Sequence, residues 1–283
     1  MKIKNVFQFL GFRGKAKHYG YAIHDVDLGN ETIHFARWLH PHHGEAKKTI
    51  NTQMVDAHRA ILKEGDFCID IGAHMGYSTL PMALAAGNSG CALALEPNPF
   101  IYHVLEKNAR ANNHATNIKT MMAAAATYEG FMKFEYSDAG FCNGGRHENI
   151  PAIKHGHPFK QEVFCLDLAK ELRENYQEFL PRLKFIKVDA EGYDLYVLKS
   201  MHDIINCYKP VIKAEVFKNT DSQYRKELLT FLLGLGYFVY KITNEPLGAG
   251  PEITEDNFNK WRHYDVLCIH KSGEIPSLLR CSE

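Results

Sequence analysis

Residues 66–87 (DFCIDIGAHMGYSTLPMALAAG) place a short apolar run directly before two glycines and a segment rich in Leu, Met and Ala. This order predicts a strand over Phe67–Ile71, a turn containing Gly72 and Gly76, and a helix over Tyr77–Ala86. A strand that is buried on both faces need not alternate polar and apolar residues. Strand, glycine turn and helix form the opening unit of nucleotide-binding α/β domains, where the helix N-terminus offers free N–H groups to a ligand.

The glycine spacing limits which nucleotide such a turn can hold. A dinucleotide fingerprint needs the pattern G-x-G-x-x-G, and counted from Gly72 its second and third glycine positions hold His74 and Tyr77. Both side chains would crowd a pyrophosphate, which argues against an NAD-dependent dehydrogenase. The pattern that fits is D-x-G-x-x-x-G, from Asp70 to Gly76, which resembles the first motif of class I S-adenosylmethionine (SAM) methyltransferases. An α/β turn without a ligand stays open as the alternative.

A second acid stands where a ribose can be held. Cys91–Leu95 predicts another short buried strand, which ends in Glu96 and Pro97, and Glu96 lies 24 residues after Gly72. An acid roughly 20 residues beyond the glycine turn, at the tip of the next strand, can accept hydrogen bonds from ribose hydroxyls. A solvated turn acid is the alternative. Small residues around Ala124 follow a third predicted strand and leave room for adenine, although plain close packing would explain them nearly as well.

Further acids follow two strands in the second half of the chain. Leu183–Val188 predicts a buried strand with Asp189 at its tip and Glu191 just beyond. Pro210–Phe217 predicts another strand, which carries Glu215 at the matching end. Open α/β sheets bind ligands at the carboxyl ends of their strands, where the strand order reverses. The three acids are therefore expected to face the same crevice as the glycine turn.

Each of these strands also carries a lysine two residues before its acid. Residues of one parity share a face of a strand, so Lys187 lies beside Asp189, and Lys213 lies beside Glu215. Lysines inside buried strands are costly unless they are paired. If the two strands are neighbours, the lysines and carboxylates are expected to neutralise one another. With Glu191 included, one negative charge remains, which suits a cationic sulfonium and is compatible with a structural ion-pair cluster.

Composition excludes several classes of protein. The 283 residues are 45% apolar and 23% charged, as in a globular chain with a sizeable core. Lys plus Arg and Asp plus Glu each number 33, which argues against generic nucleic-acid binding through a broad basic surface. No apolar run approaches ~18 residues, so no membrane span is expected. The seven scattered cysteines contain no C-x-x-C, which indicates reduced core thiols and a cytoplasmic protein.

Residues 1–50 are expected to form a short N-terminal extension of a main domain over 51–283. Tyr21–Asp27 and Glu31–Ala36 flank a glycine turn, which predicts a β-hairpin. A histidine cluster follows, for which a metal site is one interpretation. No cysteine or acid stands at a familiar zinc-ligand spacing beside it, so a solvated loop is favoured. The cluster comprises His34, His40, His42 and His43.

The segment Ser137–Gln161 interrupts the alternation of strands and helices. It holds four glycines and three histidines without a periodic apolar face. Long segments of this kind are often binding loops, so we expect it to be mobile without ligand and to close over an acceptor. Plain disorder is an equal alternative. Elsewhere, strands alternate with helices up to two closing strands at Tyr237–Ile242 and Asp265–His270, which implies a mostly parallel sheet with helices on both faces.

Four motifs together resemble the FkbM family of SAM-dependent methyltransferases. They are DIGAHMG (70–76), EPNP (96–99) with Asn108 and Asn112 in the following helix, IKVDAEGYD (186–194), and the strand that ends in Glu215. The resemblance covers about Gly65 to His270, and its most specific part is the K-x-D-x-E-G element. One departure is His74, where the family usually has asparagine.

The resemblance implies an α/β, doubly wound, mostly parallel seven-stranded Rossmann-like sheet with the last strand antiparallel. It also implies transfer of a methyl group from SAM to a hydroxyl on a sugar or small metabolite. From the motif spacing we expect SAM to lie across the strand ends, with Glu96 holding its ribose. The residues expected to contact SAM are Asp70, Gly72, His74, Gly76, Tyr77, Glu96, Pro97 and Ala124.

A neutral hydroxyl must lose its proton during methyl transfer, so a base must stand within hydrogen-bond reach. Asp189 and Glu191 are the first candidates and Glu215 the next, with Lys187 holding at least one acid ionised. A divalent metal on Asp189 and Glu215 is a weaker alternative, because hard cations prefer oxygen ligands. A SAM- or nucleotide-binding module without catalysis also stays open, although the acid cluster argues against it.

Overall fold

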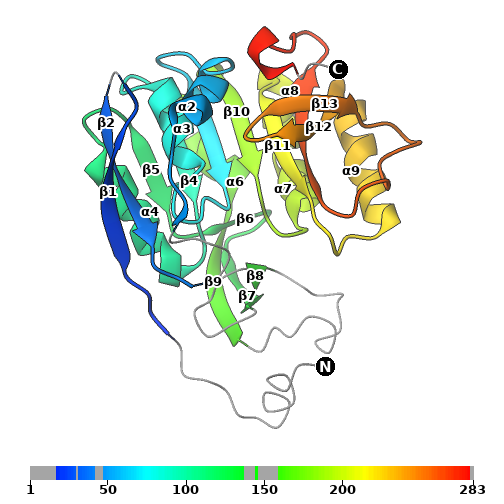
Figure 1. The fold of residues 1–283 in the computed structure, drawn as a ribbon. Coiled ribbons are helices and arrows are strands. Elements are labelled where there is room, and N and C mark those ends of the chain that lie inside the picture. The colour runs from blue at the N-terminus through cyan, green and yellow to red at the C-terminus, as the bar shows by residue number, and fades with distance from the viewer. Residues whose placement is uncertain (1–16, 30, 42–46, 137–143, 146–158, 281–283) are drawn as a thin grey trace.

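The computed structural model describes residues 17–29, 31–41, 47–136, 144–145 and 159–280. Its centre is an eight-stranded sheet with the order β13-β12-β14-β11-β10-β3-β4-β5 (Figure 1). The strands are β3 (Phe67–Ile71), β4 (Cys91–Leu95), β5 (Ile118–Met121), β10 (Leu183–Val188), β11 (Val211–Val216), β12 (Tyr237–Asn244), β13 (Gly248–Glu252) and β14 (Tyr264–His270).

The strand order reverses beside β3. The chain first moves outward from β3 to β4 and β5, and then returns to the other side of β3 with β10 and β11, all in parallel. β14 runs antiparallel to both β11 and β12. The predicted sheet with an antiparallel last strand is therefore confirmed, and β10 and β11 are neighbours as expected. An eighth strand, β13, corrects the predicted long loop after β12, which forms a hairpin instead.

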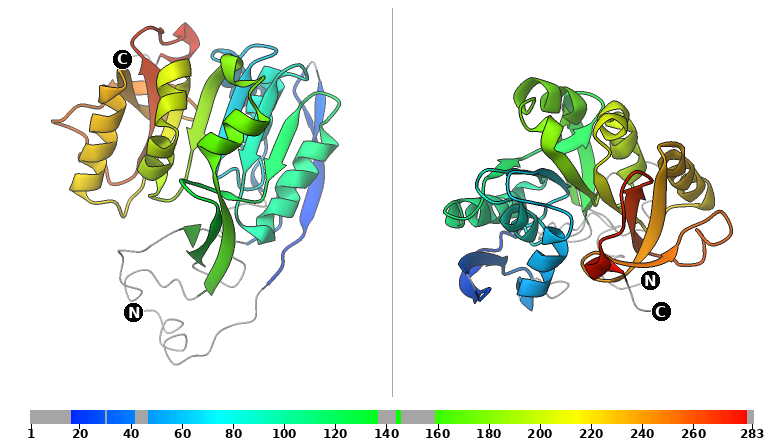
Figure 2. Two further views of the ribbon diagram at one scale, coloured as in Figure 1. Left: turned by 180° about the vertical axis from the view of Figure 1, so that it is seen from behind. Right: turned by 90° about the horizontal axis from the view of Figure 1, so that it is seen from above.

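Helices cover both faces of the sheet (Figure 2). On one face lie α2 (Thr52–Arg59), α3 (Thr79–Ala86) and α4 (Pro99–Ala111). On the other lie α6 (Leu168–Asn175), α7 (Asp194–Ser200), α8 (His202–Tyr208) and α9 (Ser222–Gly234), packed on buried side chains of β3, β10 and β11. Short 3-10 turns occupy Leu180–Arg182 and Ser277–Leu279. Every residue of α3 is buried, because this helix is covered by α2 as well as by the sheet.

A second, four-stranded sheet begins just after the carboxyl end of β5. Its order is β6-β9-β7-β8, with β6 (Ala124–Ala126), β9 (Phe159–Asp167), β7 (Gly130–Tyr136) and β8 (Gly144–Gly145). Most of the loop predicted over Ser137–Gln161 lies outside the described residues. Its described parts are strand, namely Gly144–Gly145 in β8 and Phe159–Gln161 at the start of β9, where β9 pairs antiparallel with β7.

The N-terminal hairpin consists of β1 (Tyr21–Asp27) and β2 (Thr32–Trp38), as predicted. β2 packs on α4, where two asparagine side chains act as its hydrogen-bonding partners. The Asn108 amide accepts from Ala36 N–H at 2.7 Å and donates to the carbonyls of Ala36 (2.9 Å) and Met75 (2.7 Å). Asn112 exchanges the same pair of bonds with His34, both at 2.8 Å. The hairpin is thus tied to the helix and to the glycine turn, and the domain boundary at residue 50 stays a prediction.

Asn108→Ala is expected to lower the free energy of unfolding by about 2–4 kcal/mol, because it leaves up to three buried backbone groups without a partner, at about 1–3 kcal/mol for each group that water cannot reach. Chemical denaturation followed by circular dichroism would measure the loss. Asn117→Ala is the matched control, since Asn117 donates one bond, to Gly90 O at 2.7 Å, and is only partly buried. Equal losses in the two variants would contradict the anchoring role of Asn108.

The fold can be compared with the predictions for the histidine cluster and for the cysteines. The histidine cluster is only partly a solvated loop, because His40 is buried against the rings of Trp38 and Tyr19, whereas His42 and His43 lie outside the described residues. The five described cysteines are free thiols, and four of them, at positions 68, 91, 165 and 268, lie in the core as expected, whereas Cys207 is exposed. Within the described part of the chain, no helix combines the length and apolar character that a bilayer crossing requires.

Candidate functional site

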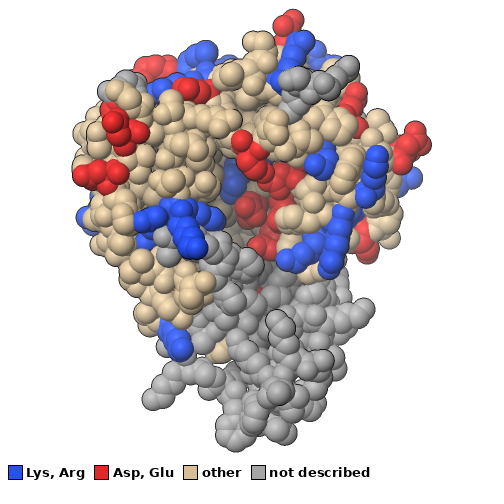
Figure 3. Space-filling view, in the orientation of Figure 1, with Lys and Arg blue, Asp and Glu red and all other residues tan. Residues whose placement is uncertain are grey.

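A cavity of about 550 Å³ lies at the carboxyl ends of the parallel strands, a size that suits a small-molecule ligand. Figure 3 shows a hollow in the middle of this face, with acidic side chains gathered along one side and a basic side chain inside it. Most of the predicted site residues line the cavity. They are Gly72, His74, Tyr77, Glu96, Pro97, Ala124, Lys187, Asp189 and Glu191, whereas Asp70, Gly76 and Glu215 lie behind its wall.

Asp70 is fully buried beneath the glycine turn. Its carboxylate accepts hydrogen bonds from the hydroxyls of Ser78 (2.7 Å) and Thr79 (2.6 Å), and Lys187 Nζ lies 3.1 Å from its other oxygen. Lys187 also donates to Gly72 O at 3.1 Å. Asp70 therefore fixes the end of β3 and the start of α3, and its predicted contact with the tail of SAM stays a prediction.

Gly72 allows two backbone segments to meet at the bottom of the cavity. Its φ is +76°, and a Cβ at this position would lie 2.0 Å from the carbonyl oxygen of Asp189. Only glycine permits that approach, which brings the end of β3 against the end of β10. Two residues on, His74 adopts a φ of 54°, which is unusual for a residue with a side chain. This conformation aims the His74 N–H at Glu96.

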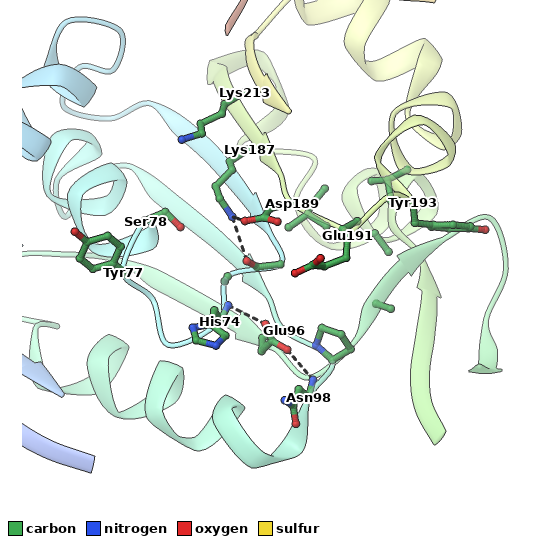
Figure 4. Close-up of a pocket in the computed structure, with 18 of the residues that line it drawn as sticks. His74, Tyr77, Ser78, Glu96, Asn98, Lys187, Asp189, Glu191, Tyr193 and Lys213 are labelled. Atoms are coloured by element: carbon green, nitrogen blue, oxygen red, sulfur yellow. Dashed lines mark hydrogen bonds and ion pairs between the residues drawn. The ribbon is translucent and has the colours of Figure 1, made fainter. Parts of the chain in front are cut away.

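Glu96 is held at the tip of β4 by two backbone donors. The N–H groups of His74 and Asn98 each donate to one of its carboxylate oxygens at 2.8 Å, as Figure 4 shows. Asn98 in turn caps α4 by accepting from Phe100 N–H at 2.9 Å. Burial raises the pKa of Glu96 to about 7, and the two backbone bonds only partly oppose that rise. Each oxygen keeps a further lone pair for a hydroxyl donor, which fits the ribose assignment.

The wall beside Glu96 is apolar and flat enough for an aromatic ring. It contains Ala123, Ala124 and Ala125, which lead from β5 into β6, and Pro97 opposite. The sequence predicted this run of small residues. It did not predict that Met132 and Phe134 of β7 complete the wall, because these two residues reach it only through the pairing of β7 with β9.

The acids after β10 lie on the other side of the cavity. The side chain of Asp189 is 45% exposed, and its carboxylate lies 3.5 Å from Lys187 Nζ. Glu191 has a φ of 51° and is followed by Gly192 at +98°. In Figure 4 the Glu191 carboxyl group points into the space between Asp189 and Glu96, whereas the Tyr193 ring points away. Burial, followed by the charge of Asp189, raises the pKa of Glu191 to about 7.

Glu215 and Lys213 do not pair as the sequence predicted. Lys213 Nζ lies 3.0 Å from Glu245 Oε2 and 3.1 Å from Asp265 Oδ2, because β14 and the β12–β13 turn bring these acids to it. Glu215 faces His263 Nε2 at 3.5 Å, and its Oε2 atom has no hydrogen-bond partner among the described residues. Burial, with nearby Asp189, raises the pKa of Glu215 to about 10. The prediction for Lys187 is confirmed for Asp189, with Asp70 as a second partner.

Several lining residues carry no local sequence signal. Lys48 comes from the end of the N-terminal extension, Met54 and His58 come from α2, and Glu245 and Pro246 come from the turn between β12 and β13. The arrival of Met54 and His58 at the site depends on the packing of α2 across the sheet. Among the described residues, no group of three or more His, Cys, Asp or Glu side chains is arranged to hold a metal ion.

Comparison with known proteins shows the family of this chain. The family model of the methyltransferase FkbM domain matches residues 70–239, which is more than half of the sequence. Methyltransferase sdnD from Sordaria araneosa is 27% identical over 169 residues, which are 51% of this chain and 63% of that protein. The chain therefore spans less than two thirds of the length of this curated relative.

Two solved structures are also similar to this chain. The FkbM methyltransferase from Methylobacillus flagellatus KT is 13% identical with a TM-score of 0.45, over 76% of this chain and 51% of that one. Aeropyrum pernix fibrillarin, solved with bound S-adenosyl-L-methionine, is 11% identical with a TM-score of 0.42, over 90% of this chain and 97% of that one. The family model matches the segment that holds the glycine turn, Glu96 and the acids after β10. The chain belongs to the FkbM family of SAM-dependent methyltransferases.

Proposed function

We propose that this chain transfers the methyl group of SAM to a hydroxyl oxygen of a small metabolite or sugar. The observation that carries the proposal is Glu191, whose half-buried carboxyl group points into the cavity on the side facing Glu96. Its pKa of about 7 suits a base that works near neutral pH. A thiol or amine acceptor has less need of such a base, whereas a neutral hydroxyl must give up its proton.

The residues present fit the cofactor. The carboxylate of Glu96 offers acceptors for two ribose hydroxyls, and the wall of Ala123–Ala125 with Pro97 offers a flat apolar surface for adenine. When bound, SAM would supply an electrophilic methyl group on its sulfonium, open to in-line attack by the acceptor oxygen, with S-adenosylhomocysteine as the leaving group. The role of the chain is then to orient the acceptor oxygen, to exclude water and to receive its proton, and positioning contributes much of the rate.

In this proposal the neighbouring acids Asp189 and Glu191 have different roles. Lys187 forms ion pairs with Asp70 and Asp189. Burial acts to lower its pKa, but the two carboxylates outweigh burial and raise it, so Lys187 stays charged. The charged lysine attracts the Asp189 carboxylate and holds it in place. Glu191 is the general base, because it lies deeper in the cavity, and Asp189 orients the acceptor hydroxyl. Glu215 does not line the cavity, and because its pKa is about 10 it is protonated near neutral pH and has no part in the proton transfer.

The test is a transfer screen with SAM labelled on its methyl group. Matched acceptors that differ only in the reacting group, such as an alcohol, an amine and a thiol on one scaffold, would separate O-methylation from the alternatives. Labelled product from hydroxyl acceptors alone is the expected result. Transfer to the amine with no transfer to the alcohol would overturn the proposed oxygen specificity while leaving the family assignment intact.

Glu96→Ala is expected to weaken SAM binding by about 1.5–3 kcal/mol, the usual range for a hydrogen bond that involves a charged group. Because the pKa of Glu96 is about 7, only part of the protein holds the ionised acceptor at neutral pH. SAM affinity should therefore fall as the pH drops below about 7, and Glu96→Gln should flatten this dependence. Isothermal calorimetry between pH 6 and pH 8.5 measures both effects. Glu106→Ala, an exposed acid of α4 paired with Arg110, is the control, and unchanged affinity in folded Glu96→Ala protein would refute the ribose assignment.

A further inference from the structure

The cavity extends beyond the proposed SAM contacts to a second region beneath α2. We name this region the α2 lobe and define it by Met54, His58, Phe185, Lys213, Glu245 and Pro246, all of which line the cavity. Its walls come from α2, from β10 and β11, and from the turn between β12 and β13. None of these residues belongs to the glycine turn, to the Glu96 site or to the acids after β10.

His58 is the polar group of this lobe whose state the structure defines best. Only 3% of the residue is exposed, and its ring meets the Phe185 ring edge-on at 5.7 Å between centroids. Nδ1 lies 2.7 Å from the carbonyl oxygen of Met54. A carbonyl oxygen can only accept a hydrogen bond, so Nδ1 carries the proton. The other nitrogen, Nε2, then presents a lone pair.

Nε2 of His58 has no hydrogen-bond partner among the described residues, although its ring lies in the wall of the cavity. An acceptor in a cavity wall that has no partner from the described residues is free to accept a hydrogen bond, so this atom favours a ligand with a hydrogen to donate. Burial, assisted by the charge of Lys213, lowers the pKa of His58 to about 4, against the opposing effects of the Met54 carbonyl and Asp70. His58 is therefore a neutral acceptor throughout the physiological range of pH.

The charged groups around the α2 lobe are already paired within the protein. Lys213 Nζ contacts both Glu245 and Asp265 and also donates to Pro246 O at 3.2 Å. An anionic ligand would meet the Glu245 carboxylate, and a cationic ligand would meet the Lys213 ammonium. Met54, Phe185 and Pro246 add apolar surface. The lobe therefore favours an uncharged molecule that has an apolar part and a hydroxyl group.

We propose that the α2 lobe binds the methyl acceptor, as an uncharged molecule whose hydroxyl group donates a hydrogen bond to His58 Nε2. This inference rests on the proposed function, since it assumes that SAM fills the remainder of the cavity. One hydroxyl of the acceptor thus binds His58, which positions the molecule, while a second hydroxyl is the reacting group and gives its proton to Glu191. The proposal gives α2 a direct part in recognition, although the helix precedes every motif that carries the family resemblance.

Four cyclohexane derivatives provide matched probes of the lobe. Protein labelled with ¹⁵N-histidine and saturated with S-adenosylhomocysteine would be titrated with cyclohexanol, cyclohexyl methyl ether, cyclohexanecarboxylate and cyclohexylammonium. Cyclohexanol is expected to bind at least tenfold more tightly than the other three and to shift the Nε2 resonance of His58. Equal binding of either charged probe, or cyclohexanol binding that leaves this resonance unchanged, would overturn the proposal.

Variants of His58 test whether the contact is direct. In His58→Phe, cyclohexanol affinity should fall to that of the ether, and in His58→Gln, which keeps an acceptor, part of the preference should return. His202→Phe changes an exposed histidine of α8 beside Asp203 and is the control. Unchanged cyclohexanol affinity in folded His58→Phe would refute the contact. Affinity for S-adenosylhomocysteine should be the same in all variants. If the parent protein does not bind S-adenosylhomocysteine, that result counts against the proposed function instead. Titration of cyclohexanol in the absence of S-adenosylhomocysteine then still tests the lobe.

Discussion

Gly72→Ala is expected to destabilise the protein by about 2–5 kcal/mol, from the left-handed backbone and from overpacking together. The new Cβ would lie 2.0 Å from the Asp189 carbonyl oxygen, a distance that no side-chain adjustment can relieve because both atoms belong to the backbone framework. The strand ends of β3 and β10 would have to separate. Since a domain of this kind has a total stability of about 5–15 kcal/mol, urea denaturation should show a large shift of the midpoint.

Gly29→Ala separates the two causes of this loss. Gly29 also has a positive φ, of +88°, but a Cβ there would meet no atom within 4 Å. Its replacement should cost only the conformational strain, about 1–2 kcal/mol. If Gly72→Ala were no more damaging than Gly29→Ala, the contact with Asp189 would be relieved by a small shift. The glycine would then be needed for its backbone conformation alone.

Glu191→Gln is expected to lower turnover by ~10²-fold or more on a verified acceptor, the usual contribution of a positioned base. The parent enzyme should turn over faster as the pH rises through about 7, because the base must be deprotonated and burial places its pKa there. The variant should lose that dependence while it keeps its affinity for SAM. Steady-state rates between pH 5.5 and pH 9, together with calorimetry, measure the two properties separately.

Asp189→Asn should lower turnover by a similar factor, because it removes the carboxylate that Lys187 holds in place at 3.5 Å. Glu227→Gln is a suitable control, since this exposed acid of α9 pairs only with surface groups. Parental rates in both acid variants would make the cluster structural. Activity that disappears with a chelator and returns with magnesium would replace the base by a metal ion.

The centre of the sheet could be predicted because its strands have a strong local signal. β3, β4, β10 and β11 are short apolar runs bounded by glycine, proline or acids, and parallel strands that are buried on both faces need no other pattern. β9 was missed in part because Lys160, Gln161 and Glu162 conceal its inward-facing residues. β13 was missed because the sequence GAGPE has the composition of a loop, and it is a strand only through its pairing with β12.

The residues of the candidate site also differ in whether the local sequence indicates their position. Gly72, Glu96 and Asp189 were found because each follows a strand directly, and Glu191 because it lies just beyond Asp189, so that sequence position alone places them at the edge of the sheet. Lys213 was paired wrongly, because its real partners come from segments more than 30 residues further along the chain. Residues that reach the site through tertiary packing have no such local signal, and His58 on α2 is the clearest case.

The Asn108 side chain has a consequence for how the protein opens. One amide bonds the β2 backbone at Ala36 and the glycine turn at Met75, so neither segment can leave its place without releasing the other's partner. Fluctuations of the hairpin and of the cofactor turn are thereby joined into one cooperative unit. A ligand that orders the turn also protects a strand that it does not touch. Binding of a ligand at the glycine turn is therefore expected to slow hydrogen exchange in the N-terminal hairpin as well.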